Sequence, residues 1–196
     1  MNAKTKEIVG NIVWFVALVA IVLGIRFFIM HPVQVSGHSM DPTLEDRQRI
    51  IAFNSTDNIK RFDIVTFPAP DDPGKSYIKR VIGLPGDEIE YRNDELFING
   101  KRHDEPYLDA FKKKLDADEW LTYYVYEGTN QATTNFSLED LQACGTKKVP
   151  KGSLFVLGDN RQNSKDSRYI GYIKIKDVSG DVKFSIWPPR KFGTVK

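Results

Sequence analysis

The sequence predicts a mostly β domain behind a single N-terminal transmembrane helix. Three observations support this class: one long apolar run near the N-terminus, short β-type runs between turn signals after Pro32, and an ordinary globular composition. The 196 residues are 41% hydrophobic and 28% charged, which suits one domain with a sizeable core. The apolar run comes first in the chain, and the β-type runs follow it.

The apolar run predicts a membrane anchor. From Ile8 to Ile25 it reads IVGNIVWFVALVAIVLGI, and it continues through FFIM to Met30. A helix needs about 20 apolar residues to cross a bilayer core. A cleaved signal peptide is the alternative, because Lys4 and Lys6 precede the run, but no small-x-small cleavage site follows Gly24. We therefore expect a short cytoplasmic-type tail at 1–7, an anchor at 8–30 and a β-rich domain at 31–196.

The basic residues leave the orientation of the anchor open. Lys4 and Lys6 precede the helix, whereas Arg26, Arg47 and Arg49 follow it closely. The two counts nearly balance, so the positive-inside rule does not decide the topology.

Short runs rich in β-branched and aromatic residues predict the strands of the domain. The first group is VQVSG, RQRIIAF, FDIVTF, SYIKRVIG, DEIEYR and ELFING, and the second is SLFVLGDN, GYIKIKDV and DVKFSIW. The NDELFINGK stretch is typical of a hairpin. Between about 101 and 150 the regular alternation of strand-like runs and turns is interrupted. We expect an insertion there, in which Ser137 and Asp140 open one short helix.

Charge and cysteine content exclude several function classes. The 28 basic residues nearly balance 26 acidic ones, and the basic run at 112–114 is too short to predict nucleic-acid binding. Cys144 is the only cysteine, so no intrachain disulfide forms, and we expect it to be a small buried residue. We expect no nucleic-acid partner, no cofactor and no metal.

The segment SGHSMDPTL at 36–44 contains the residue types of a serine protease triad. Neighbouring side chains of an extended chain point to opposite faces, so His38 does not easily reach the hydroxyl of Ser39. His31 lies at the membrane exit and His103 flanks a hydrophilic hairpin. A group other than histidine must therefore activate the serine.

Lys79 is the candidate base. In SYIKRVIG, alternation places it with Tyr77 and Val81 on one face of an apolar strand. Lowering the pKa of a lysine from about 10.4 to about 7.4 costs roughly 4 kcal/mol, within the range that burial produces. Neutral lysine is a competent general base. The alternative is that Lys79 snorkels from a strand edge.

Four ordered segments resemble a known family. SGHSMDPTL, RFDIVTF, YIKRVIGLPGD and LGDNRQNSKDSR are similar to the sequence boxes of bacterial type I signal peptidases. The resemblance implies a membrane-anchored Ser/Lys protease with a signal-peptidase-type β catalytic domain. It also implies cleavage of signal peptides from exported preproteins on the outer face of the cytoplasmic membrane, with the N-terminus cytoplasmic. We expect preproteins and membrane lipid as partners, and a monomer.

The resemblance also implies roles for individual residues. Ser39 matches the nucleophile, Lys79 the general base, and Ser164 the serine whose hydroxyl orients that lysine. The implied supporting charges are a pair formed by Asp159 and Arg80, together with Asp166 and Arg168, which shape the site. The alternative for these charges is surface ion pairs worth under about 1 kcal/mol.

Two positions depart from the family pattern. Gly37 stands where some members carry a serine that helps to bind the oxyanion. The oxyanion hole must then rest on backbone N–H groups, above all that of Ser39, with a water or a rearranged Ser36 as the further candidates. Gln162 stands where aspartate is common.

Three other function classes compete with this assignment. Ser76 and Lys79 also form the S-x-x-K motif of penicillin-binding proteins and class A β-lactamases, but the S-D-N and K-T-G partners are absent. A self-cleaving repressor domain would need a DNA-binding domain and no anchor. A noncatalytic anchored scaffold would not need Ser39 and Lys79 together.

The membrane anchor also constrains the site. Nine residues separate Met30 from Ser39 and span about 30 Å at most when extended, so the active site is expected near the lipid surface. The FSIWPP stretch at 184–189 either contacts lipid or belongs to the core.

Overall fold

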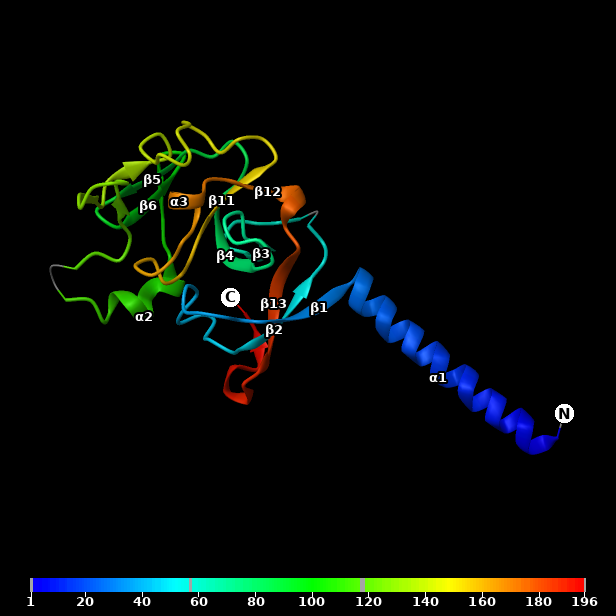
Figure 1. Ribbon diagram of the computed structural model, residues 1–196. Helices are drawn as coiled ribbons and strands as arrows, with labels where there is room; N and C mark the ends of the chain where they lie inside the picture. Colours follow the sequence, from blue (N-terminus) through cyan, green and yellow to red (C-terminus); the bar gives the residue numbers. More distant parts are fainter. Residues whose placement is uncertain (1, 57, 117–118, 196) are drawn as a thin grey trace.

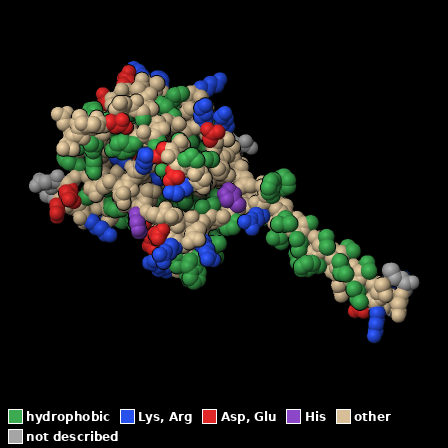
Figure 2. Space-filling model, in the orientation of Figure 1, with side chains coloured by type: hydrophobic (Ala, Val, Ile, Leu, Met, Phe, Trp, Pro, Cys, Tyr) green, Lys and Arg blue, Asp and Glu red, His purple; other side chains and the backbone are tan. Residues whose placement is uncertain are grey.

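Helix α1 spans Ala3–Phe28 and projects from the rest of the chain (Figure 1). The computed structural model describes residues 2–56, 58–116 and 119–195. Among these residues, Lys4–Phe28 is the one helical segment long and apolar enough to cross a membrane, with a mean hydropathy of 2.7. Figure 2 shows hydrophobic side chains along the projecting helix. A helix that is apolar all round and packs against no protein is typical of a membrane span.

The main sheet is antiparallel, and it contains both the first and the last strand of the β domain. In spatial order its strands are β1 (Met30–Gln34), β2 (Arg49–Phe53), β13 (Gly180–Trp187), β3 (Ile64–Pro68), β4 (Ser76–Gly83), β11 (Ser153–Leu157) and β12 (Ile173–Lys174), with β14 (Gly193–Thr194) beside β13. Strand β1 starts two residues after α1 ends. The anchor is therefore joined directly to an outer strand of the sheet.

A smaller sheet lies beside the main one (Figure 1). Its order is β10 (Phe136–Ser137), β5 (Ile89–Arg92), β6 (Glu95–Ile98) and β7 (Lys101–His103), and a separate hairpin pairs β8 (Tyr124–Val125) with β9 (Ala132–Thr133). The helical elements of the domain are short: η1 (Pro106–Leu108), α2 (Asp109–Lys112), α3 (Ser167–Ile170), η2 (Ile175–Asp177) and η3 (Pro189–Lys191). Strands β7 and β10 come from the segment at about 101–150, so this segment completes the smaller sheet.

The helix predicted after Ser137 is wrong. Ser137 ends strand β10, and its backbone N–H and its hydroxyl both donate to Asp140 Oδ2 at 2.7 Å. These bonds close a turn rather than start a helix. Pairing of Phe136 with Tyr91 of β5 and burial of Leu138 hold the segment in this path.

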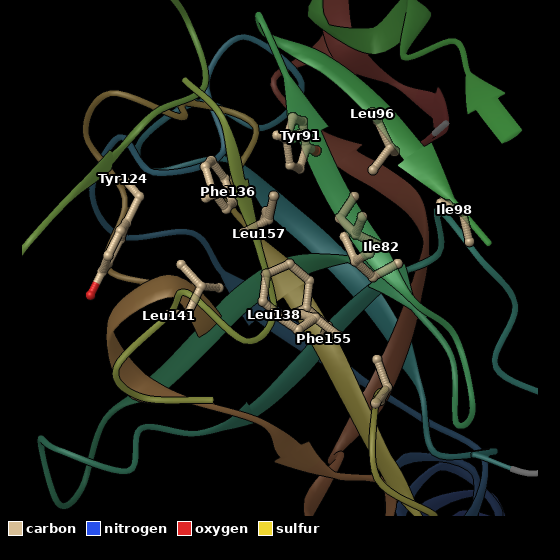
Figure 3. Close-up of a cluster of buried hydrophobic side chains, with 12 residues drawn as sticks. Ile82, Tyr91, Leu96, Ile98, Tyr124, Phe136, Leu138, Leu141, Phe155 and Leu157 are labelled. Atoms are coloured by element: carbon tan, nitrogen blue, oxygen red, sulfur yellow. The ribbon is translucent and has the colours of Figure 1, made fainter. Parts of the chain in front are cut away.

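Three clusters of buried side chains form the core. The first joins the smaller sheet to β4 and β11, as Figure 3 shows for Tyr91, Phe136 and Phe155. Cys144 is half-buried at its edge, where burial raises the thiol pKa to about 12. The second packs the segment that follows β1 against the main sheet through Met40, Leu44, Val35, Ile50, Ala52, Ile64, Ile78 and Val182. The third fills the space beside β3 and β11.

Candidate active site

Ser39 follows strand β1, and hydrogen bonds from Asn160 hold its own carbonyl group and that of the residue before it. Its carbonyl oxygen accepts a hydrogen bond from Asn160 N–H at 3.0 Å, and the carbonyl of His38 accepts one from Asn160 Nδ2 at 3.0 Å. The next side chain, Met40, is 1% exposed and anchors the segment in the core. These contacts fix the backbone of Ser39 and leave its side chain at a groove.

Lys79 reaches Ser39 from strand β4. Its Nζ donates to Ser39 Oγ at 2.9 Å and to the carbonyl of Ile78 at 3.1 Å, and the side chain is 3% exposed. Burial lowers the pKa of Lys79 to about 8, although the carboxylates of Asp166 and Asp159 act in the opposite direction. Lys79 therefore faces inward and does not snorkel from a strand edge.

The histidines are engaged away from Ser39. The ring of His38 is exposed and bonds Asp41 at 2.9 Å, and the ring of His31 bonds the Asn54 side chain at 2.7 Å. His103 lies on strand β7 of the smaller sheet. The compressed triad therefore does not form.

Two buried ion pairs surround the Ser39–Lys79 contact. Arg80 donates through Nε and Nη2 to both oxygens of Asp159, at 2.8 and 2.6 Å, and these side chains are 2% and 0% exposed. Arg168 likewise donates to both oxygens of Asp166, at 2.9 Å each. Removing one partner of such a buried pair costs about 3–5 kcal/mol. The alternative of weak surface pairs is thus wrong for these four residues.

Asp166 also connects its ion pair to the loop before it. Its Oδ2 accepts the backbone N–H of Gly158 at 3.1 Å, while Arg168 donates to the carbonyl of Arg161 at 2.7 Å. Burial acts to raise the pKa of Asp166, but the charge and hydrogen bonds of Arg168 outweigh it and hold that pKa below its ordinary value. The carboxylate stays charged and fixes the loop at 158–168.

Ser164 lies on this loop next to Gly158. Its hydroxyl oxygen is buried and forms no hydrogen bond among the residues that the structure describes. A Cβ built at Gly158 would lie 2.6 Å from Ser164 Cβ and 2.5 Å from the Ser39 carbonyl oxygen. The absence of a side chain at Gly158 thus brings Ser164 and Ser39 together, and a bond from Ser164 to Lys79 stays a prediction.

Gly37 has a backbone conformation that glycine favours. Gly37 has φ 89°, a conformation that side-chain-bearing residues rarely adopt, and its N–H donates to Asp46 Oδ1 at 2.9 Å. The N–H of Ser39 has no hydrogen-bond acceptor in the described part of the chain. Of these two N–H groups, that of Ser39 is the one free to bind an oxyanion.

A buried network that the sequence reasoning missed ties the site loop to the smaller sheet. Arg161 donates to the carbonyl of Gly158 at 3.0 Å and to Tyr91 Oη at 2.8 Å, and it forms an ion pair with Glu105. Arg161 is 1% exposed. Thr43, also missed, donates to Asp159 at 2.5 Å. Arg161 stands inside the quoted LGDNRQNSKDSR segment, but its distant partner Glu105 left no sequence signal.

A groove of about 580 Å³ opens beside the two side chains, lined mainly by residues 33–40 and 75–79. Strand β1 is the outer strand of the main sheet, so one edge of it is unpaired there. Strand β4 pairs with β11 only from Arg80 onward, which leaves the edge at 76–79 unpaired on that side. Two free strand edges therefore border the groove that Ser39 lines.

Known proteins are similar to this chain over nearly its whole length. The family model described as "Signal peptidase, peptidase S26" matches residues 8–187. The chain is 43% identical to a signal peptidase I of Bacillus caldolyticus, over 91% of both chains. It is 38% identical to signal peptidase IB of Staphylococcus aureus (strain COL), over 95% of this chain and 93% of that protein.

A solved structure agrees with these relatives. The crystal structure of a signal peptidase I from Enterococcus faecalis V583 matches with a TM-score of 0.57 and 42% identity, over 65% of this chain and 98% of that one. The chain therefore belongs to the signal peptidase family, peptidase S26. It is a membrane-anchored serine endopeptidase of the signal peptidase I type, which cleaves signal peptides.

Proposed function

We propose that the enzyme cuts preproteins after Ala-x-Ala, with Ser39 as nucleophile and Lys79 as general base. The observation that carries this proposal is the 2.9 Å contact between Lys79 Nζ and Ser39 Oγ, made by a lysine that is 3% exposed. Desolvation favours the neutral amine, which is the form able to accept a proton.

The proposed reaction is acyl transfer in two steps. Neutral Lys79 takes the hydroxyl proton of Ser39 as Ser39 Oγ attacks the carbonyl carbon before the cut, and the resulting oxyanion accepts a hydrogen bond from the Ser39 N–H. The ammonium of Lys79 then gives its proton to the leaving nitrogen as the peptide bond breaks. A water, deprotonated by Lys79, hydrolyses the acyl-enzyme and frees Ser39.

Supporting roles are proposed for the residues around the two reacting side chains. Ser164 is proposed to orient Lys79, because its buried hydroxyl has no other hydrogen-bond partner among the described residues. The pairs Arg80–Asp159 and Arg168–Asp166 hold the elements that carry the two reacting side chains. No cofactor and no metal ion take part in this scheme.

Single substitutions test the nucleophile. Ser39→Ala should abolish preprotein cleavage, whereas Ser76→Ala, on an exposed residue at the start of β4, should leave most of it. The S-x-x-K alternative requires the opposite result. It would also place Ser76 on a helix, but this residue starts a strand.

The base is tested by comparing lysine with histidine. Lys79→Ala should abolish cleavage, and joint replacement of His31, His38 and His103 should leave it largely intact. Loss of chemistry in a folded triple-histidine variant would restore the triad. Sequencing of the new N-terminus after incubation with one preprotein locates the cut.

Substrate selection is proposed to follow from strand addition. An extended peptide between the free edges at 33–36 and 76–79 gains main-chain hydrogen bonds, and its alternate side chains meet the enzyme. Residues one and three before the cut share one face, and the apolar lining next to Ser39 includes Val35, Met40 and Ile78. Both positions should therefore select small residues, because an overfilled pocket costs about 1–3 kcal/mol.

Initial rates on five substrate variants test this selection. Leucine or phenylalanine at either alanine should block cleavage, and leucine at the middle position should be tolerated. Efficient cutting after a bulky residue, or dependence on the middle position alone, would overturn the specificity proposal.

The proposed topology places the N-terminus in the cytoplasm and the domain on the outer face, as a monomer beside lipid. Ile186 and Trp187 are 37% and 54% exposed, which argues against the core alternative for these two side chains and favours lipid contact. With Trp14 and Trp120 replaced by phenylalanine, brominated lipid should quench Trp187 fluorescence. Unquenched emission would contradict this contact.

Labelling in intact cells tests the orientation. In a Cys144→Ser background, a Lys4→Cys substitution should react with an impermeant thiol reagent only after the membrane is opened. Reaction in intact cells would reverse the topology.

A further inference from the structure

A second hollow lies beside the catalytic groove. Its volume is about 600 Å³, and it shares Asn163 and Lys165 with the lining of the groove beside Ser39. Ser164 lines it as well. The second hollow is therefore adjacent to the groove, on the side of the loop at 158–168.

The charges of the second hollow do not cancel. Asp71 and Lys165 form an ion pair across it, and the hydrogen bond from Lys165 lowers the pKa of the Asp71 carboxyl. Glu127 also lines the hollow, and it has no ion-pair partner within residues 2–56, 58–116 and 119–195. One negative charge is left over.

Glu127 is presented by the segment that the sequence reasoning treated as an insertion without chemistry. It lies in the turn between β8 and β9, which is closed by hydrogen bonds from Tyr126 N–H to Gln131 O and from Thr129 N–H to Tyr126 O, both at 3.1 Å. Gly128 in this turn has φ 72°. The hairpin thus places a carboxylate at the hollow through a defined turn.

A hydrogen bond also fixes the position of Gln162 in the lining of the second hollow. Gln162, which lines it, donates from Nε2 to the carbonyl of Trp120 at 3.0 Å. This bond joins the site loop to the segment that leads into β8. Gln162, where aspartate is common in the family pattern, adds no second negative charge there.

The proposed binding of the signal peptide sets the direction of a bound substrate. With the residues before the cut along the strand edges at 33–36 and 76–79, the residues after it leave Ser39 on the side where Asn163 and Lys165 line both the groove and the second hollow. An extended peptide advances about 3.3 Å per residue, so two or three residues beyond the cut span about 7–10 Å past Ser39. A space of roughly 300–1,000 Å³ holds a ligand of that size.

We propose that the second hollow binds the first residues of the mature chain, and that Glu127 makes it prefer a cationic side chain there over an acidic one. This inference rests on the proposed function of Ser39 and Lys79. It gives the β8–β9 hairpin a role in substrate selection.

Paired substrates test this preference. Two peptides carry the same Ala-x-Ala signal and differ only in lysine or glutamate at the third residue after the cut. The wild-type enzyme should cleave the lysine peptide with a kcat/KM about twofold to fivefold higher, as expected for a partly exposed charge pair. Added salt should shrink this ratio.

Variants of the enzyme locate the charge that is responsible. Glu127→Lys should invert the ratio, and Glu127→Gln should bring it close to one. Glu139→Lys makes the same change of net charge at an exposed position of the same segment that does not line the hollow, and it should keep the wild-type ratio.

The outcomes separate the inference from the proposed function. If wild-type enzyme cuts both peptides at the same rate, or if Glu127→Lys and Glu139→Lys change the ratio equally, the role of Glu127 is refuted while the cleavage mechanism stands. If wild-type enzyme cuts neither peptide after Ala-x-Ala, the proposed function itself fails.

Discussion

A methyl group at Gly158 should disable the enzyme without touching any reacting atom. The Cβ of Gly158→Ala would lie 2.5 Å from the Ser39 carbonyl oxygen and 2.6 Å from Ser164 Cβ, against 3.4–4 Å for an ordinary contact. Relief of the first contact alone moves the Ser39 backbone by about 0.9 Å, the difference between 3.4 and 2.5 Å. A displacement of about 1 Å costs about 100-fold in rate.

The assay is kcat on a peptide with an Ala-x-Ala signal, measured beside thermal unfolding. Overpacking should also lower the free energy of unfolding by about 1–3 kcal/mol, so kcat is compared below the unfolding transition. Gly10→Ala is the matched control, because no atom lies within 4 Å of its added Cβ. A folded Gly158→Ala enzyme with kcat within about threefold of the wild-type value would refute the reasoning.

Three further predictions concern charge and backbone geometry. The rate should rise with pH through an apparent pKa near 8, because Lys79 must be neutral; a flat profile between pH 6 and 9 would contradict this. The lowered pKa of Lys79 also means that the folded state binds fewer protons than the unfolded state between pH 8 and 10.5. The Lys79 side chain therefore opposes folding by about 3 kcal/mol below pH 8 and progressively less above it. Lys79→Met should therefore raise the unfolding temperature at pH 7, and a lower value would count against the buried ammonium. Asp159→Asn should cost about 3–5 kcal/mol of folding free energy, whereas Asp72→Asn, which breaks the exposed pair with Lys75, should cost under about 1 kcal/mol in chemical denaturation. Equal losses would argue against the buried pair.

The residues of the candidate site could be predicted from the sequence because they lie in short, ordered segments. Period-2 alternation placed Lys79 on one face of a strand with Tyr77 and Val81 but did not decide whether that face is buried, and one apolar run was enough to predict the anchor. The two side chains are 40 residues apart in sequence, and only the resemblance to a family paired them.

The supporting contacts were not accessible in the same way. Arg161 and Glu105 meet across 56 residues, and each is an ordinary charged residue in its own segment. The position of Glu127 depends on how the β8–β9 hairpin packs, which no local pattern encodes. The error at Ser137 has the same origin, because a capping pattern also fits a closed turn and strand pairing of Phe136 decides between them.

A direct titration of Lys79 tests the central claim that a buried, readily neutralised lysine activates Ser39. The full chain in detergent, labelled with ¹³C at the lysine Cε, gives one resonance for each lysine, and loss of a peak in Lys79→Met assigns the one of interest. This resonance should titrate with a pKa of about 8. A midpoint near the ordinary lysine value of 10.5, in an enzyme that still cleaves its substrate at pH 7, would contradict it.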